Sequence, residues 1–436
     1  MIFRWLTSKA VREACAMRKH VHRLISAQRD VLSPQAMGAV TTAMNEVQKA
    51  IAEGANTGKI RIKAEELEFA ANKWLKPYPN PVRRENVEVL LVAIAVAMGV
   101  RTFFLQPFKI PTGSMQPTLY GVNSVPDFSR INFRSEDRSK VQAQIDAQLK
   151  QQNSLNTPTG LGRIKAWFAG DSYLHIVAEA DGELEKVGKP VGIFIFNIKQ
   201  TIWIGGHAQT IWFPPDYGEA PLWARAGLHP HDIFGEGQLC RKGEDLVKMR
   251  VSAGDHLFVD RLTYNFRKPE RGEIVVFETK GIPEEGRERW NIPSDEFYIK
   301  RLVGLGGETL SLARDYDVAV TPPYGATVPV GHLVVNGMPV SASTPHFENL
   351  YSFSEPPAHA KVLVYRDNQY YGHAMQQNLS PGSEFQIHPD CDFVMGDNTM
   401  NSLDSRYWGD FPATSIIGKS FFVYWPITSR FGWGNQ

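Results

Sequence analysis

The spacing of apolar residues along the chain predicts three helices before any other element. Apolar residues recur every three to four positions between Val11 and Ile25, a period typical of a helix with one buried face. Ser33-Pro34 predicts a stop and a restart, because proline is tolerated in the first turn of a helix, and a second helix then runs to about Glu53. A third helix is expected from Ile62 to Leu75. Residues 1–80 are therefore predicted to form a small helical segment.

One apolar run, from Val87 to Leu105, is long enough to cross a membrane. No charged residue occurs between Val89 and Val100, and a span needs ~20 residues to cross the hydrocarbon layer. The run reaches this length because Glu88 and Arg101 can extend their charged ends to the two interfaces. We predict a transmembrane helix over residues 87–105. The alternative is a helix buried in a protein core.

Charged residues beside this run indicate its orientation. Basic residues are slightly more numerous before the run than after it, which favours a cytoplasmic N-terminus. The sequence therefore predicts a single-pass protein of the cytoplasmic (inner) membrane, with residues 1–80 in the cytoplasm and residues 106–436 outside. The basic residues concerned are Lys73, Lys76, Arg83 and Arg84 before the run, and Arg101 and Lys109 after it.

Strand-like patterns predominate after the apolar run. Residues 121–250 have the character of an inserted α+β segment, with a short helix over 140–151. In the same segment Asp181-Gly182 predicts a tight turn, and a β-hairpin of strands over 173–180 and 183–187 is expected.

From Val251 onward the sequence predicts a mainly β region built of antiparallel sheets, with a β insertion at about 310–390. A hairpin turn is expected at Asn336-Gly337, and an aromatic strand over 421–425 is expected to close the sheet. The other predicted strands cover residues 254–261, 272–277 and 296–303.

Composition excludes some functions and leaves others open. The chain has 47 Lys and Arg against 46 Asp and Glu, so its overall charge gives no reason to expect nucleic-acid binding. Its three cysteines form no metal-ligand or haem motif, and a Cys240–Cys391 disulfide is possible without the spacing demanding it. Residues 1–30 carry seven basic and two acidic residues, which leaves open a basic surface that lies on anionic lipid.

The stretch after the apolar run has the features of a rigid corner that presents a serine. Pro111 and Pro117 each fix one backbone dihedral, and Gly113 permits unusual ones immediately before Ser114. A serine becomes a nucleophile only if another group removes its proton. The alternative for a serine between glycine and proline residues is an ordinary loop residue.

Lys300 is the natural candidate to remove that proton. In a strand it shares its face with Tyr298 and Leu302, both largely apolar. Burial disfavours the ammonium form and can lower a lysine pKa by up to ~3–5 units, which would make Lys300 a general base near neutral pH. The alternative is a lysine that extends from a sheet edge into water.

A cluster of short polar residues over 395–406 is typical of a loop rich in turns. It could also supply a hydroxyl that holds a lysine and ion pairs that pin the sheet. Together with the two earlier stretches it resembles type I signal peptidases, the membrane-anchored serine proteases with a Ser/Lys dyad. The family pattern is a membrane span followed by four boxes, which this sequence matches in order at Gly113–Leu119, Gly254–Val259, Lys300–Gly304 and Gly396–Arg406.

The resemblance implies a role for each matched residue. Ser114 would be the nucleophile and Lys300 the general base, while the Ser114 backbone N–H and the Thr112 hydroxyl would form the oxyanion hole. Ser402 would orient Lys300, and Met115 would contact the substrate. The supporting ion pairs would be Asp397 with Arg301 and Asp404 with Arg406.

The resemblance also implies a catalytic region of the signal-peptidase type over 106–436. Such an enzyme would cleave signal peptides from exported precursor proteins, with membrane lipid as a second partner and no metal or cofactor. Two rivals remain: a self-cleaving repressor-like peptidase, which the membrane span argues against, and an anchored scaffold, which has no reason to retain Ser114, Lys300 and Ser402.

The chain departs from the family pattern at three places. Gly306 stands where the family usually has proline, so a looser loop is expected after Lys300. Thr399-Met400 replaces the usual Arg-Asp, which removes one charge pair. The two dyad residues lie 186 positions apart because the middle segment is long.

Overall fold

The computed structural model of the chain describes residues 8–76, 81–127, 155–193, 196–218, 221–226, 237, 239–319, 327–351 and 370–433. The chain divides into two compact units, Met1–Ala95 and Val96–Gln436. The helix predicted over 140–151 lies outside the described residues.

The first unit contains a bundle of three helices, α2 (Lys9–Gln28), α3 (Pro34–Ala52) and α4 (Thr57–Trp74). The predicted restart at Pro34 is present, and the Ser33 hydroxyl caps α3 by accepting a hydrogen bond from the Ala36 amide. α4 begins five residues before the predicted Ile62, because the Asn56 side chain caps it through the Lys59 amide. The bundle has its own core, which includes the fully buried side chains of Val40, Val47 and Leu67.

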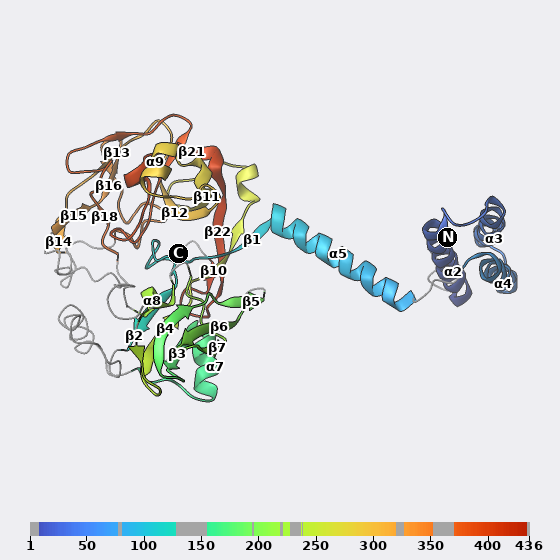
Figure 1. Cartoon of the computed structure of the whole chain (residues 1–436). Coiled ribbons are helices and arrows are strands. Elements are labelled where there is room, and N and C mark those ends of the chain that lie inside the picture. Colours follow the sequence, from blue (N-terminus) through green and yellow to red (C-terminus); the bar gives the residue numbers. More distant parts are fainter. Residues whose placement is uncertain are drawn as a thin grey trace. The chain divides into compact units, whose positions relative to one another are not determined.

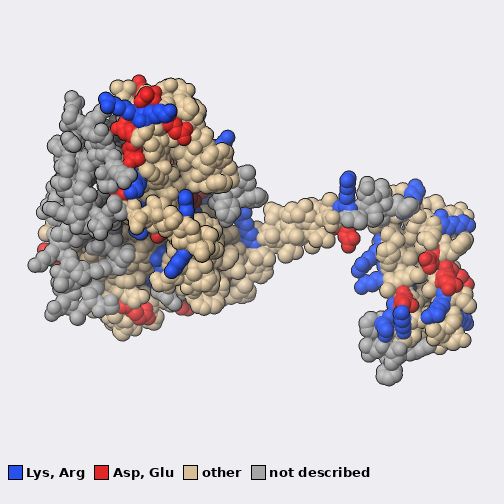
Figure 2. All heavy atoms as spheres, turned by 90° about the horizontal axis from the view of Figure 1, so that it is seen from below, with Lys and Arg blue, Asp and Glu red and all other residues tan. Residues whose placement is uncertain are grey.

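The predicted apolar run forms α5 (Pro81–Phe103). Within Arg83–Phe103, a window of 18 residues has a mean hydropathy of 1.7, and none of that window is buried in the protein. The middle of this helix carries no charged side chain on the face seen in Figure 2. By length and composition α5 can cross a membrane, and its full exposure does not fit a helix in a protein core.

The second unit is built mainly of antiparallel sheets (Figure 1). Its largest sheet has eight strands in the order β1-β10-β22-β11-β12-β20-β21, with β23 beside β22. The aromatic strand β22 lies between β10 and β11, so the prediction that it closes the sheet is wrong. The bounds are β1 (Leu105–Lys109), β10 (His256–Asp260), β11 (Ile274–Glu278), β12 (Phe297–Gly304), β20 (Cys391–Met395), β21 (Phe411–Pro412), β22 (Ile416–Trp425) and β23 (Gly432–Trp433).

The middle segment forms two further sheets. One has the order β2-β9-β3, and the other has the order β5-β6-β4-β8 with β7 also paired to β6. The bounds are β2 (Asn123–Pro126), β3 (Asp171–Val177), β4 (Gly182–Val187), β5 (Val191–Ile193), β6 (Phe196–Ile204), β7 (His207–Trp212), β8 (Leu239–Cys240) and β9 (Asp245–Ser252), with helices α7 (Leu161–Phe168) and α8 (Leu222–Arg225).

The predicted hairpin in this segment is wrong. β3 pairs with β9, and β4 pairs with β6 and β8, so the two strands lie in different sheets. Gly182 approaches Gly205 so closely that an added Cβ would lie 2.5 Å from the Gly205 Cα, which holds β4 against the end of β6. The Asp181-Gly182 turn therefore passes the chain from one sheet to the other.

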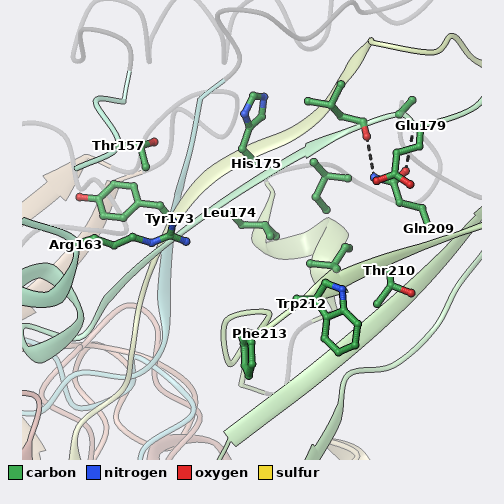
Figure 3. Close-up of a pocket in the computed structure, with 14 residues that line it drawn as sticks. Thr157, Arg163, Tyr173, Leu174, His175, Glu179, Gln209, Thr210, Trp212 and Phe213 are labelled. Carbon is green, nitrogen blue, oxygen red and sulfur yellow. Dashed lines mark hydrogen bonds between the residues drawn. The ribbon is translucent and has the colours of Figure 1, made fainter. Parts of the chain in front are cut away.

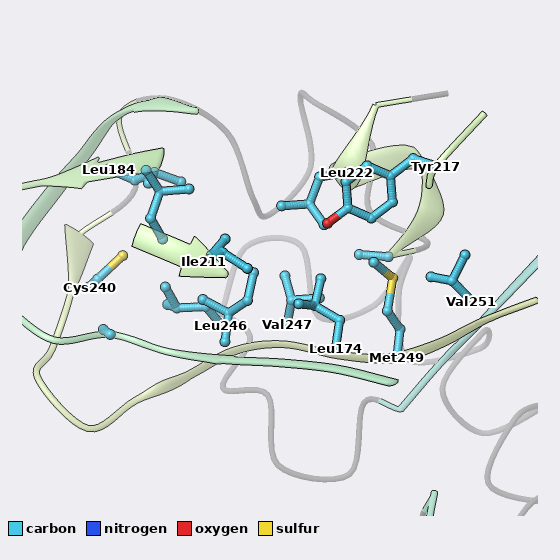
Figure 4. Packing of buried hydrophobic residues seen from close by; sticks show 14 of the residues in the cluster. Leu174, Leu184, Ile211, Tyr217, Leu222, Cys240, Leu246, Val247, Met249 and Val251 are labelled. Carbon is cyan, nitrogen blue, oxygen red and sulfur yellow. The ribbon is translucent and has the colours of Figure 1, made fainter. Parts of the chain in front are cut away.

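A cavity of about 500 Å³ lies between β3 and β7 (Figure 3). At one end of it the Gln209 side chain donates to the Val177 carbonyl at 2.8 Å and accepts from the Glu179 amide at 3.2 Å. Tyr173, His175, Trp212 and Phe213 are among its lining residues. Beside the cavity, apolar residues of both sheets pack into one core, in which Leu184 and Val247 are fully buried (Figure 4).

The last segment adds two small sheets to the second unit. Their strand orders are β17-β16-β13-β19 and β14-β15-β18. The predicted turn at Asn336-Gly337 joins β16 and β17, and both residues have positive φ, as a tight hairpin turn requires. The bounds are β13 (Thr309–Leu312), β14 (Tyr316–Ala319), β15 (Thr327–Gly331), β16 (Leu333–Val335), β17 (Met338–Pro339), β18 (His373–Ala374) and β19 (Phe385–Gln386), with short helices α9 (Glu284–Arg289) and α10 (Ser405–Trp408).

Candidate active site

The chain that carries Ser114 follows β1 and is held by residues that immediately precede β10. Asp255 lies at the start of β10, and its buried carboxylate accepts a hydrogen bond from the Tyr120 amide at 2.7 Å. Gly254 leaves no room for a side chain, because an added Cβ would lie 1.9 Å from the Ile110 carbonyl oxygen. The second sequence box, Gly254-Asp255, therefore positions the segment on either side of Ser114.

Ser114 and Lys300 meet inside the protein. The Lys300 Nζ lies 2.7 Å from the Ser114 Oγ, and it also donates to the Ile299 carbonyl at 3.1 Å. Lys300 is 4% exposed and Ser114 is 7% exposed. The Lys300 Nζ lies 5.4 Å from the centroid of the Tyr298 ring. The arrangement places an amine in contact with a hydroxyl in largely apolar surroundings.

Two further residues lie against Ser114. The Thr112 Oγ1 is 3.5 Å from the Ser114 Oγ. Met115 is fully buried and packs with Ile110 and Leu119, so its side chain belongs to the core of this corner. The substrate contact predicted for Met115 stays a prediction.

Asn398 is a site residue that the sequence interpretation missed. Its amide donates to the Ser114 carbonyl at 3.0 Å, and its side chain donates to the Gly113 carbonyl at 2.8 Å. Gly396 comes equally close, since an added Cβ would lie 2.4 Å from the Ser114 carbonyl oxygen. Asn398 could have been identified from its place in the Gly396-Asp397-Asn398 box, but the sequence interpretation assigned a role only to the neighbouring Asp397.

Ser402 lies beside this contact but does not bond to Lys300. Its hydroxyl is buried and has no hydrogen-bond partner within the described part of the chain. An added Cβ on Gly396 would lie 2.2 Å from the Ser402 Oγ, so the hydroxyl packs against the glycine. The orienting role predicted for Ser402 stays a prediction.

Both predicted ion pairs are formed and buried. Arg301 donates to Asp397 through Nε at 2.8 Å and through a terminal nitrogen at 2.6 Å, and Asp397 also accepts from Thr118. Arg406 donates to Asp404 in the same two-pronged way, at 2.8 and 2.7 Å. Burial alone would raise the pKa of Asp404, but the charge and hydrogen bonds of Arg406 lower it.

Two of the departures from the family pattern have structural explanations. Gly306 packs so tightly that an added Cβ would lie 1.9 Å from the Pro389 carbonyl oxygen, so the expectation of a looser loop is wrong. Thr399 accepts hydrogen bonds from Arg406 at its carbonyl (2.9 Å) and at its hydroxyl (3.2 Å). The threonine therefore helps to hold the buried arginine.

The inserted segment contacts the corner that carries Ser114, which the sequence interpretation did not foresee. Lys109, at the end of β1, forms an ion pair with Asp216. Arg225, at the end of α8, donates to the Val122 carbonyl at 2.5 Å. Burial and the nearby Arg225 lower the pKa of Lys109 to about 8. Burial and Lys109 lower the pKa of His256, the neighbour of Lys109 on β10, to about 4.

Two strand edges beside the dyad have no partner among the described strands. The first is the outer edge of β1, which is the end strand of its sheet. The second is the edge of β12 before Arg301, because β20 pairs with β12 only from Arg301 onward. The rings of Phe108 on β1 and Phe297 on β12 lie 5.4 Å apart. The two edges therefore approach each other on either side of Ser114 and Lys300.

The described part of the chain shows no metal cluster and no disulfide. Within the described ranges no three His, Cys, Asp or Glu side chains are grouped so that they could hold a metal ion. Cys240 and Cys391 lie in different sheets and are not joined by a disulfide. None of the residues assigned above to the site lines the cavity between β3 and β7.

Comparisons with known proteins match the same boxes. The family model described as "Signal peptidase, peptidase S26" matches residues 83–129 and 247–425, just over half of the chain. The helical bundle and most of the inserted segment lie outside this match.

Among curated proteins, a "Signal peptidase I" of Leptolyngbya laminosa is 30% identical over 177 residues, which cover 41% of this chain and 63% of the relative. A "Signal peptidase I" of Pseudomonas aeruginosa is 28% identical over 199 residues, which cover 41% of this chain and 62% of the relative. The chain thus spans slightly less than two thirds of the length of these relatives.

Among solved structures, a signal peptidase I from Enterococcus faecalis overlaps 35% of this chain and 97% of its own at 22% identity, with a TM-score of 0.21. The family match covers most of α5, the serine corner, β10, β12 and the polar loop that ends at Arg406. On that match, the chain belongs to the signal peptidase family, peptidase S26.

Proposed function

We propose that this chain is a membrane-anchored serine endopeptidase that removes signal peptides from exported precursor proteins. The observation that carries the proposal is the 2.7 Å contact between the Lys300 Nζ and the Ser114 Oγ, both buried. The names of the curated relatives support the same activity.

In the proposed reaction Lys300, as a neutral amine, takes the proton from Ser114 as the Ser114 Oγ attacks the carbonyl carbon of the scissile bond. The proton then passes to the leaving amine, and the new N-terminus departs. Water, with its proton taken by Lys300, attacks the acyl-enzyme. As the bond between the acyl group and the Ser114 Oγ breaks, Lys300 returns that proton to the Ser114 Oγ, and the signal peptide is released. The Ser114 amide and the Thr112 hydroxyl would stabilise the oxyanion, and one such donor is typically worth ~2.7–4 kcal/mol.

The surroundings of Lys300 support its role as a base. Its side chain is 4% exposed, and desolvation favours the neutral amine over the ammonium. Two of the atoms that it contacts, the Ser114 hydroxyl oxygen and the Ile299 carbonyl oxygen, carry no formal charge. As a neutral amine, Lys300 can accept the Ser114 proton through the lone pair on its Nζ.

The two open strand edges support an extended substrate. A peptide that lies between β1 and β12 would pair with backbone groups on both sides and pass the Ser114 Oγ. Such backbone pairing tolerates many sequences, as an enzyme with many precursor substrates requires. The preference at individual positions would come from side-chain pockets along the two strands.

Membrane anchoring is part of the proposal and rests on α5. The helix is exposed along its apolar length, and basic residues are more numerous before it than after it. We infer a single-pass protein with its N-terminus in the cytoplasm and residues 106–436 outside. Protease treatment of oriented vesicles should protect residues 1–80 and digest the second unit, and the reverse pattern would reject this orientation.

Cleavage of a purified precursor tests the dyad. Ser114→Ala and Lys300→Met should each reduce kcat by at least ~10³-fold, because removal of either member of a nucleophile–base pair abolishes its activation. Lys280→Met removes an exposed lysine and serves as the matched control. Cleavage at the native rate by either dyad variant would show that the assignment is wrong.

A further inference from the structure

The N-terminal bundle carries its charges unevenly. α2 has five basic residues and one acidic residue, α3 has one of each, and α4 has four basic and three acidic residues. Lys and Arg side chains lie on the surface of this unit (Figure 2). The excess positive charge of the bundle is therefore concentrated on one helix.

Three of the five basic residues of α2 form a stripe on its solvent-facing side. Arg12, Lys19 and Arg23 are all exposed and follow one another at intervals of seven and four residues, so they lie on one face over ~16 Å of helix. The opposite face packs Val11 and Val21 into the bundle core. We call Arg12, Lys19 and Arg23 the basic face of α2.

Two lysines on the other helices, Lys49 and Lys63, have acidic neighbours. The Nζ of Lys49 lies 4.0 Å from a Glu53 carboxylate oxygen, and Lys63 lies 3.4 Å from Glu46 and 2.7 Å from Glu66. For the residues that the structure describes, no carboxylate forms an ion pair with Lys19 or Arg23. The charges of Lys19 and Arg23 are thus left for a partner outside the bundle.

Gln28 fixes this helix beside the point where the chain leaves the bundle. Its side chain accepts from the Lys76 amide at 3.1 Å and donates to the Lys76 carbonyl at 2.7 Å. The end of α2 that carries Arg23 and Arg29 therefore lies next to Lys76. Only residues 77–80 separate Lys76 from the start of α5, and a chain of this length spans at most ~18 Å.

We propose that the basic face of α2 binds the anionic phospholipid surface of the leaflet in which α5 begins. This inference rests on the membrane anchoring proposed above. An anionic leaflet attracts basic side chains within about one Debye length, ~8–10 Å, and the short connection keeps the bundle close to that range. A nucleic acid or an acidic protein would also suit the charge, but neither is held near α2 by the chain.

Labelling of lysine amines with an acylating reagent, resolved by mass spectrometry, tests the proposal on the full-length chain. The chain is reconstituted in nanodiscs of phosphatidylcholine alone or of phosphatidylcholine with phosphatidylglycerol. Lys19 should be labelled several-fold more slowly in the anionic discs, and high salt should remove the difference. Lys59, an exposed lysine of α4, should be labelled equally in both and is the internal reference.

Two charge-neutralising variants separate the basic face from overall charge. Arg12→Gln with Arg23→Gln should abolish the protection of Lys19 in anionic discs. Lys59→Gln with Arg61→Gln removes the same charge from α4 and should leave that protection intact. Far-UV circular dichroism of both variants should match that of the native chain, since all four residues are exposed.

Three outcomes would overturn the proposal. The first is equal labelling of Lys19 in both kinds of disc, and the second is an equal loss of protection in the α4 variant. The third is protection that appears only after RNA is added, which would assign the basic face to another partner. Co-elution of the chain with the discs tests anchoring separately, and precursor cleavage tests the dyad, so the three proposals can fail independently.

Discussion

At the scale of single residues, the buried cations near Ser114 differ in their partners. Arg301 and Arg406 are each held by a carboxylate through two hydrogen bonds, which keeps their charge balanced in the interior. Lys300 contacts the Ser114 hydroxyl and the Ile299 carbonyl. A guanidinium stays charged in either setting, whereas an amine can lose its proton, and the proposed reaction depends on that difference.

Asp392 is a buried acid whose charge should cost stability. Burial and the charge of Glu308 raise the pKa of Asp392 from 3.8 to about 6. Because its pKa is higher in the folded state, its stabilising contribution is complete below pH ~4 and is lost as the pH rises through the folded value. We expect Asp392→Asn to raise the free energy of unfolding above pH ~7 by up to ~3 kcal/mol and to change it little below pH ~4.

Denaturant unfolding of the chain in detergent, followed at both pH values, measures this effect. Asp295→Asn replaces an exposed aspartate and is the control. A gain for Asp392→Asn that is as large in acid as at neutral pH would contradict the prediction, because titration would then not be its cause.

At the scale of elements, α8 braces the chain that follows the nucleophile. Arg225 donates to the Val122 carbonyl at 2.5 Å and to the Tyr217 carbonyl at 2.6 Å, while the Val122 amide donates to the Pro111 carbonyl at 3.3 Å. These contacts connect the inserted segment to both ends of the corner that presents Ser114. The insertion is therefore part of the support of the site.

Arg225→Met should reduce cleavage without unfolding the protein. A displacement of ~1 Å at the nucleophile can cost ~10²-fold in rate, so we expect kcat to fall by ~10–100-fold. Arg241→Met, at an exposed residue of the same segment, should cleave normally. Native kcat in the Arg225 variant, with an unchanged melting temperature, would show that the corner holds its shape without this brace.

At the scale of the whole molecule, each of the two units has its own core. The bundle buries residues such as Val40, Val47 and Leu67 among its three helices, and the second unit builds separate cores in its sheets. A core that is complete within one unit does not need the other unit to fold. The proposed chemistry is carried by residues of the second unit.

Deletion of residues 1–76 should therefore leave precursor cleavage within about threefold of the native rate. Such a change corresponds to less than ~1 kcal/mol in the activation barrier. The truncated chain retains α5 and is assayed in detergent or nanodiscs beside the full-length chain. A matched truncation that carries Ser114→Ala reports the background. A large loss of kcat with an intact melting transition of the second unit would mean that the bundle takes part in the reaction.

Local patterns in the sequence determined the helices and the candidate residues. Helical spacing, the Ser33-Pro34 restart and the apolar run gave α2 to α5, because a helix is stabilised by hydrogen bonds and side-chain contacts within a few residues. The serine corner and the lysine of β12 were found for the same reason, since each lies in a short stretch with its own turn or strand pattern.

Tertiary structure alone decided which distant segments meet. It paired β3 with β9 in place of β4, placed β22 inside the sheet, and brought Asn398 to the Ser114 carbonyl. Strand pairing and close packing depend on which surfaces can be buried together, and a period of two or 3.6 residues names the buried face but not its partner. The 2.7 Å contact between Ser114 and Lys300, 186 positions apart, is the clearest example.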